Sequence, residues 1–130
     1  MDKYSFKAKW YNPDNSPPSS RQTSIRLPIL ASARIDAICE MFPNKTKSAI
    51  LNDLIIHALE LFIKELDPEP GKEISSDEEG ISYEDVGESG RFVRLTQKYL
   101  DKYQENLNEE DKVKIGEPVH FISHSDLKNK

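Results

Sequence analysis

Polar and hydrophobic side chains alternate over residues 22–27, a stretch with the sequence QTSIRL. In a strand this alternation would give a mostly apolar face of Thr23, Ile25 and Leu27 and a polar face of Gln22, Ser24 and Arg26. Pro28 has no N–H to give to a sheet, so it would end the strand. One strand is not stable alone, and no second strand with matching turn chemistry lies nearby. We therefore expect it to pair with the same strand of a second copy of the chain.

Apolar residues after Pro28 recur at helical spacing in two segments separated by a turn. The first helix is expected at about residues 29–42, with an apolar stripe formed by Ala31, Ile35, Ile38, Cys39 and Phe42. Pro43 would break this helix, and the hydroxyl of Thr46 would cap a second helix that runs to about Leu66. The second helix is apolar around much of its circumference, which is more surface than one neighbouring helix can cover. This surplus also predicts burial against a second copy of the chain.

The composition divides the chain into four parts. Residues 1–20 form an N-terminal arm, for which two interpretations stay open: a basic arm that follows a DNA backbone, or an aromatic segment packed on the core. Residues 21–66 are the strand and the two helices. Residues 67–90 are acidic and contain glycine and serine, which predicts an acidic linker. Residues 91–130 form a C-terminal segment with an amphipathic helix at 91–107 and a short extended stretch near 114–122.

The charges of the chain are unevenly distributed. The net charge of −5 is unusual for a protein that binds a polyanion. However, residues 1–66 carry nine Lys and Arg against seven Asp and Glu, whereas residues 67–130 carry nine against sixteen. The acidic excess therefore belongs to the second half, and dimerisation would double the positive field of the first half.

Two short motifs resemble the ribbon-helix-helix repressors of the Arc, MetJ and CopG type. The run from Gln22 to Pro28 is similar to their recognition strand, and Thr46-Lys47-Ser48 is similar to the turn that anchors a phosphate. The resemblance covers 46 of 130 residues, from Arg21 to Leu66. It implies a mainly α fold with a short strand: an intertwined homodimer with an intermolecular two-stranded antiparallel ribbon, which enters the major groove of DNA.

The same motifs supply the expected contacts with double-stranded DNA. Gln22, Ser24 and Arg26 would contact bases, since Arg suits guanine and Gln suits adenine in the major groove. Phosphates would be bound at the start of the second helix, where N–H groups and the helix dipole attract anions, by Lys45, Thr46, Lys47 and Ser48. The sequence therefore predicts a sequence-specific DNA-binding homodimer that acts as a transcriptional repressor. The alternative is an antitoxin or other interaction protein, whose acidic C-terminal half binds a protein partner through residues 91–130.

Other chemistry finds little support in the sequence. His120 and His124 are four residues apart, but they span an extended, Pro-containing stretch, and neither they nor His57 belong to a pattern of further metal ligands. We find no nucleophile–base pair and no glycine-rich phosphate loop, so no metal, cofactor or enzymatic activity is expected. No apolar run approaches the ~18 residues of a membrane span. The single cysteine, Cys39, indicates a reducing compartment, and we expect a cytoplasmic protein.

Overall fold

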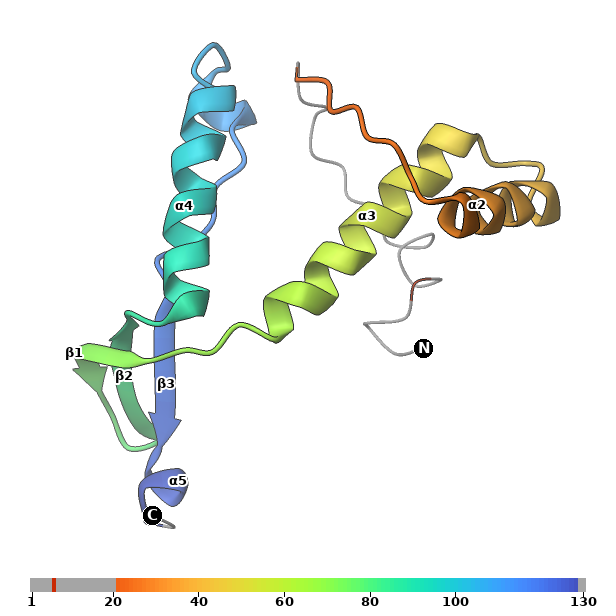
Figure 1. The fold of residues 1–130 in the computed structure, drawn as a ribbon. Coiled ribbons are helices and arrows are strands. Elements are labelled where there is room, and N and C mark those ends of the chain that lie inside the picture. Colours follow the sequence, from red (N-terminus) through yellow and green to blue (C-terminus); the bar gives the residue numbers. More distant parts are fainter. Residues whose placement is uncertain (1–5, 7–20, 129–130) are drawn as a thin grey trace. The chain divides into compact units, whose positions relative to one another are not determined.

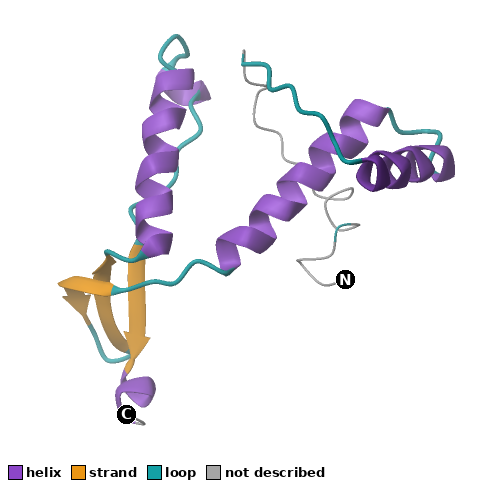
Figure 2. Cartoon of the chain, viewed as in Figure 1, coloured by secondary structure: helices purple, strands orange, loops and turns teal. Residues whose placement is uncertain are grey.

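The computed structural model describes Phe6 and residues 21–128, and these residues belong to two compact units. The first unit is Met1–Ile63 and the second is Lys64–Lys130. The predicted N-terminal arm, residues 1–20, lies outside the described residues except for Phe6. Figures 1 and 2 show the elements of each unit.

The first unit contains the two predicted helices. Helix α2 is Ile29–Met41 and helix α3 is Lys47–Lys64, so both lie within about two residues of their expected bounds. Pro28 precedes α2 with a φ of −56° and a ψ of 152°, an extended conformation that suits a residue just before a helix. The Thr46 hydroxyl accepts a hydrogen bond from the Ala49 N–H at 3.1 Å, which confirms the predicted cap of α3.

The predicted strand at residues 22–27 is absent. Residues 21–28 have no regular secondary structure, and all eight are exposed. A strand is stable only when it forms hydrogen bonds with a neighbouring strand. No strand among the described residues pairs with this segment. The alternating pattern is therefore carried by an irregular segment in this chain.

The second unit holds a three-stranded antiparallel sheet in the order β1-β2-β3. Strands β1 (Pro70–Ser76) and β2 (Gly80–Asp85) form a hairpin, helix α4 (Glu88–Tyr103) follows, and β3 (Val119–Ser123) pairs with β2. A 3-10 turn at Glu109–Asp111 and helix α5 (His124–Lys128) complete the unit. In the β2–β3 ladder Ile81 lies opposite Ile122 and Tyr83 opposite His120.

This sheet overturns the predicted fold class. The protein is a mixture of helices and an antiparallel sheet, and not a mainly α ribbon-helix-helix chain with one short strand. The hairpin occupies the stretch whose composition predicts a linker. Its turn is formed by polar contacts and not by an apolar pattern: one Asp77 carboxylate oxygen accepts the N–H groups of Glu79 at 2.8 Å and Gly80 at 3.0 Å. Asp77, one of the acidic residues that suggested a linker, is therefore the residue that closes the turn of the hairpin.

The turn from β2 to α4 is held by the carboxylate of Asp85, which is only 4% exposed. Its Oδ1 accepts the N–H groups of Glu69 at 3.1 Å and Gly87 at 2.9 Å, and its Oδ2 accepts the hydroxyl of Ser89. Burial raises the pKa of Asp85, but the hydrogen bonds from Ser89, Gly87 and Glu69 outweigh it, and the pKa lies below its ordinary value. The residue therefore remains a carboxylate that ties the start of β1 to the start of α4.

A second polar side chain fixes the chain that follows α4. Gln104, 6% exposed, donates from Nε2 to the Val113 carbonyl at 2.9 Å and accepts the Val113 N–H at 2.5 Å through Oε1. Seven residues earlier, within α4, Gln97 Oε1 accepts the N–H of Ile115 at 3.2 Å. The segment that leads to β3 is thus bound to α4 through side-chain amides.

Candidate nucleic-acid interface

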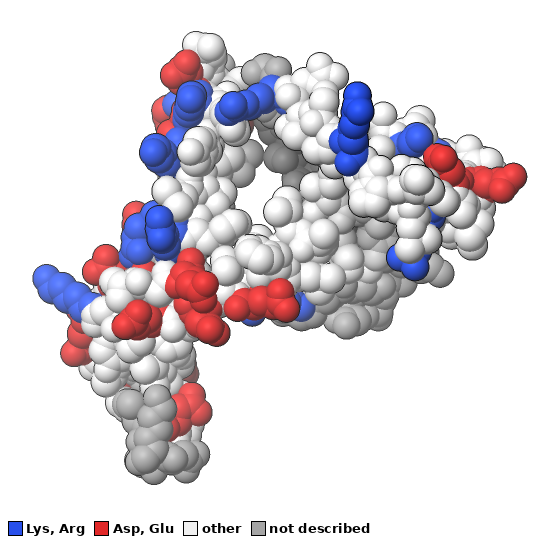
Figure 3. All heavy atoms as spheres, viewed as in Figure 1, with Lys and Arg blue, Asp and Glu red and all other residues white. Residues whose placement is uncertain are grey.

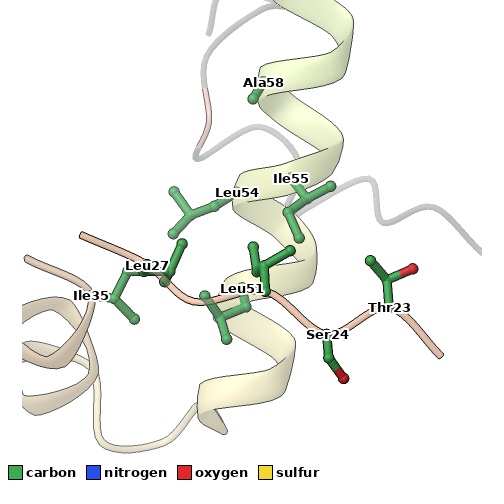
Figure 4. Close-up of a pocket in the computed structure, with 9 residues that line it drawn as sticks. Thr23, Ser24, Leu27, Ile35, Leu51, Leu54, Ile55 and Ala58 are labelled. Carbon is green, nitrogen blue, oxygen red and sulfur yellow. The ribbon is translucent and has the colours of Figure 1, made fainter. Parts of the chain in front are cut away.

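The polar residues predicted to contact bases lie on the exposed segment before α2. Gln22, Ser24 and Arg26 are all exposed, and they occupy alternate positions of this segment. Figure 4 shows the side chains of Thr23 and Ser24 on opposite sides of the backbone. The segment therefore presents polar groups at every second residue even though it forms no strand.

The same segment borders an apolar groove of the first unit, with a volume of about 550 Å³ (Figure 4). The groove is lined from the segment, from α2 and from α3 by Thr23, Ser24, Ile25, Leu27, Ile35, Leu51, Leu54, Ile55 and Ala58. Its apolar side chains are incompletely covered: Ile25 is 69% exposed and Ile55 is 53% exposed. The polar residues Gln22, Ser24 and Arg26 therefore lie on an irregular segment beside a groove, and not on one face of a strand.

The described residues of the first unit enclose little apolar interior. Among the described residues, Ile50 is the single fully buried apolar side chain. Large apolar side chains remain exposed along the rest of α3, at Leu59, Leu61, Phe62 and Ile63. Exposed apolar surface on this scale is typical of a face that another protein surface covers.

The predicted phosphate-binding residues lie together at the start of α3. Thr46, Lys47 and Ser48 are exposed and Lys45 is half-buried. The first-turn N–H groups of a helix have no partner within the helix, and here Thr46 takes up the one from Ala49. The N–H groups of Lys47 and Ser48 precede it in the same turn, where the positive end of the helix dipole favours an anion.

Lys47 has a competing partner in the same unit. Its Nζ lies 3.1 Å from Oδ1 of Asp36 on α2, and the two side chains are 62% and 66% exposed. An ion pair this exposed contributes little to stability because water screens it. Lys47 would therefore lose little free energy if it left Asp36 to contact a phosphate.

The histidines do not form a common site. The His57 ring meets Phe6 edge-on, with centroids 5.6 Å apart, and its buried Nδ1 has no hydrogen-bond partner among the described residues. His124 Nε2 lies 2.9 Å from the Asp77 carbonyl oxygen, and His120 lies on β3 beside Asp85. Within residue 6 and residues 21–128, no group of three or more His, Cys, Asp or Glu could hold a metal ion.

Sequence reasoning predicted the helix of the second unit, at 91–107 against α4 at Glu88–Tyr103, and an extended stretch that overlaps β3, but it missed the hairpin and one surface on α4. The surface on α4 could have been predicted, because four Lys and Arg recur along this helix at helical spacing. The hairpin could not, because single polar contacts stabilise it and they produce no periodic pattern in the sequence. No helix in the described part of the chain is long and apolar enough to cross a membrane.

Comparison with known proteins finds no family model, no curated protein and no solved structure that matches this chain.

Proposed function

We propose that the protein is a sequence-specific DNA-binding homodimer that acts as a transcriptional repressor. The carrying observation is that the three candidate base-reading side chains, Gln22, Ser24 and Arg26, are all exposed at alternate positions of one segment. This segment and the start of α3 belong to the same compact unit. From the resemblance to ribbon-helix-helix repressors we retain only these two sets of contact residues, and not the ribbon.

Dimerisation follows from the apolar surface of the first unit. The first unit, Met1–Ile63, is small for a body with an independent core, and Ile50 is the one fully buried apolar side chain among the described residues. A second copy placed against the groove and the exposed face of α3 would bury Ile55, Leu59 and Phe62, each at least half exposed in the single chain. It would also place two sets of base-reading residues on one DNA duplex, as a two-fold symmetric site requires.

Cytoplasmic localisation belongs to the same proposal. In a cell without a nucleus, a protein that binds genomic DNA must be in the cytoplasm. Cys39 is a free, half-buried thiol, as is usual in a reducing compartment.

A salt titration of DNA binding tests the phosphate contacts. Lys47→Ala should weaken binding to random-sequence duplex and lower the slope of log K against log salt by about 1.8, because each of the two copies loses one phosphate contact of about 0.9. The matched control is Lys64→Ala, the same change at the other end of α3. If the two variants behave alike, or if the full chain binds no duplex DNA at low salt, the proposed function is wrong.

A second candidate, an interaction protein that binds a partner through residues 91–130, has one observation in its favour. Strand β3 exposes Val119 and Phe121, each 49% exposed, as a partner-binding sheet would. In that case Phe121→Ser should abolish co-purification of one stoichiometric protein partner while DNA affinity stays unchanged. If no stoichiometric partner accompanies the unmodified chain, this candidate is excluded.

A further inference from the structure

The outward face of α4 carries a row of positive charge. Its members recur at intervals of three or four residues: Arg91, Arg94, Lys98 and Lys102. Residues at this spacing are neighbours on one face of a helix, and the row extends over about 16 Å of the helix axis. Figure 3 shows basic side chains following α4. We call these four residues the basic row of α4.

The basic row is accessible. Arg91, Lys98 and Lys102 are exposed, and the ion pairs of the described residues include none of the three. Arg94 lies 3.3 Å from Glu84, with side chains 38% and 47% exposed, so this pair is weak. Like charges one helical turn apart repel each other, and the row therefore lowers helix stability unless an anionic partner lies against it.

Aromatic side chains border the row on one side. Tyr99 and Tyr103 are each 45% exposed and their ring centroids are 6.2 Å apart. Lys98 Nζ lies 5.7 Å from the centroid of the Tyr99 ring. Tyr hydroxyls, like Lys and Arg, are common donors to phosphate oxygens in protein–DNA complexes.

The acidic excess of the second unit lies in the hairpin and at the start of α4, where Ser89 donates its N–H to the Asp67 carbonyl and its hydroxyl to Asp85. Lys98 and Lys102 lie at least nine residues further along α4, about 14 Å or more from this end. Residues 67–87 contain eight Asp and Glu against one Lys, whereas α4 contains four Lys and Arg against two Asp and Glu. The turn acids at 77–79 precede β2 and α4 follows it, so a strand of about 17 Å separates them from the helix. Charges in solution are screened over about 8 Å at physiological salt. Glu84 and Glu109 are already paired, with Arg94 and with Lys112 and Lys114.

We propose that the basic row of α4 is a second DNA-binding surface, which contacts the phosphate backbone of double-stranded DNA beside the segment bound by the first unit. The identity of this partner rests on the proposed function. An extended row of cations bordered by tyrosines suits the regular series of phosphates on a duplex better than the irregular charges of an acidic protein. The five residues between α3 and β1 span at most about 20 Å when extended. DNA bound by the first unit is therefore held at high local concentration near α4.

The test compares variants that have the same net charge but differ in where the charge is lost. The full chain, Lys98→Gln/Lys102→Gln and Lys72→Glu are titrated with random-sequence duplexes at several salt concentrations. Both variants lower the net charge by two, but Lys72 lies on β1, outside the basic row. A duplex of about 40 base pairs is used, because the connection and α4 together reach about 44 Å, or about 13 base pairs at 3.4 Å each.

Lys98→Gln/Lys102→Gln should lower the slope of log K against log salt by about 3.6, because each of the two copies in the dimer loses two contacts of about 0.9 each. Lys72→Glu should match the unmodified chain. If the two variants have the same salt slope, the second surface is overturned, whether α4 binds an acidic protein or nothing. If the double variant alone loses affinity while Lys47→Ala does not, the second surface stands and the proposed role of the first unit fails.

Discussion

Replacement of Asp85 by Asn tests whether one buried carboxylate holds the second unit together. The side chain accepts two backbone N–H groups and one hydroxyl, and it is 4% exposed. Asn has nearly the same shape and keeps an oxygen for the N–H groups of Glu69 and Gly87, but it loses the charge. A hydrogen bond to a charged group contributes about 1 kcal/mol more than a neutral one, so three such bonds predict a loss of about 2–3 kcal/mol.

The assay is urea unfolding of the full chain, followed through the amide NMR signals of β2 and β3. Glu78→Gln is the matched control, because it removes an exposed carboxylate from the same hairpin. The control should stay within about 0.5 kcal/mol of the unmodified chain, as most surface changes do. An Asp85→Asn chain that is equally stable would refute the role assigned to the carboxylate.

The pH dependence provides an independent check of the same residue. Because the pKa of Asp85 in the folded chain lies below its ordinary value of 3.8, the carboxylate contributes its stability above pH 3.8. That contribution is lost as the pH falls through 3.8 toward the lower pKa of the folded state. The stability difference between the unmodified chain and Asp85→Asn should therefore be constant above about pH 5 and shrink below pH 4. A difference that stays constant down to pH 3 would contradict this assignment.

Three further substitutions test other contacts. Gly90→Ala should cost about 2 kcal/mol or more, because a Cβ there would lie 1.9 Å from a backbone carbonyl oxygen, whereas Gly116→Ala meets nothing within 4 Å and should be neutral in the same urea titration. Gln104→Leu should cost about 2–3 kcal/mol, since it removes both partners of the Val113 backbone, and rapid exchange of the Val113 amide would accompany it. Ile55→Glu should convert a dimer to the 14.9 kDa monomer in sedimentation equilibrium, and a dimer that survives it would place the interface elsewhere.

The first unit shows what apolar spacing can predict. Helices α2 and α3 follow from residues such as Ile35, Leu51 and Leu54, which recur every three or four positions, and the hydroxyl of Thr46 defines the start of α3. The predicted strand was wrong because alternation alone provides no hydrogen-bonding partner. An alternation of polar and apolar residues indicates which side chains would lie on the same face of a strand. The strand itself also needs a second strand within hydrogen-bonding distance.

Helix α4 of the second unit lies close to the predicted helix at 91–107, whereas the hairpin shows why the rest could not be predicted. Strands β1 and β2 contain few apolar residues, and β1 is exposed along nearly its whole length. Their arrangement depends on single polar side chains, Asp77, Asp85 and Gln104, that bind backbone groups up to 16 residues away in sequence. Such contacts depend on the folded geometry and leave no periodic trace. Of the candidate site, the sequence predicted the exposed polar series and the capped start of α3, while the role of both in binding stays a prediction.

Selection from a pool of random duplexes tests the central claim, sequence-specific DNA binding through residues 22–26, most directly. The full chain should enrich a motif made of two related half-sites, because two copies would read the duplex symmetrically. Arg26→Ala should select the same motif with the preference at one base pair in each half-site relaxed, a loss of about 1–3 kcal/mol of discrimination there. If the full chain enriches no motif, or if Arg26→Ala enriches an unchanged one, the exposed segment before α2 does not read DNA sequence.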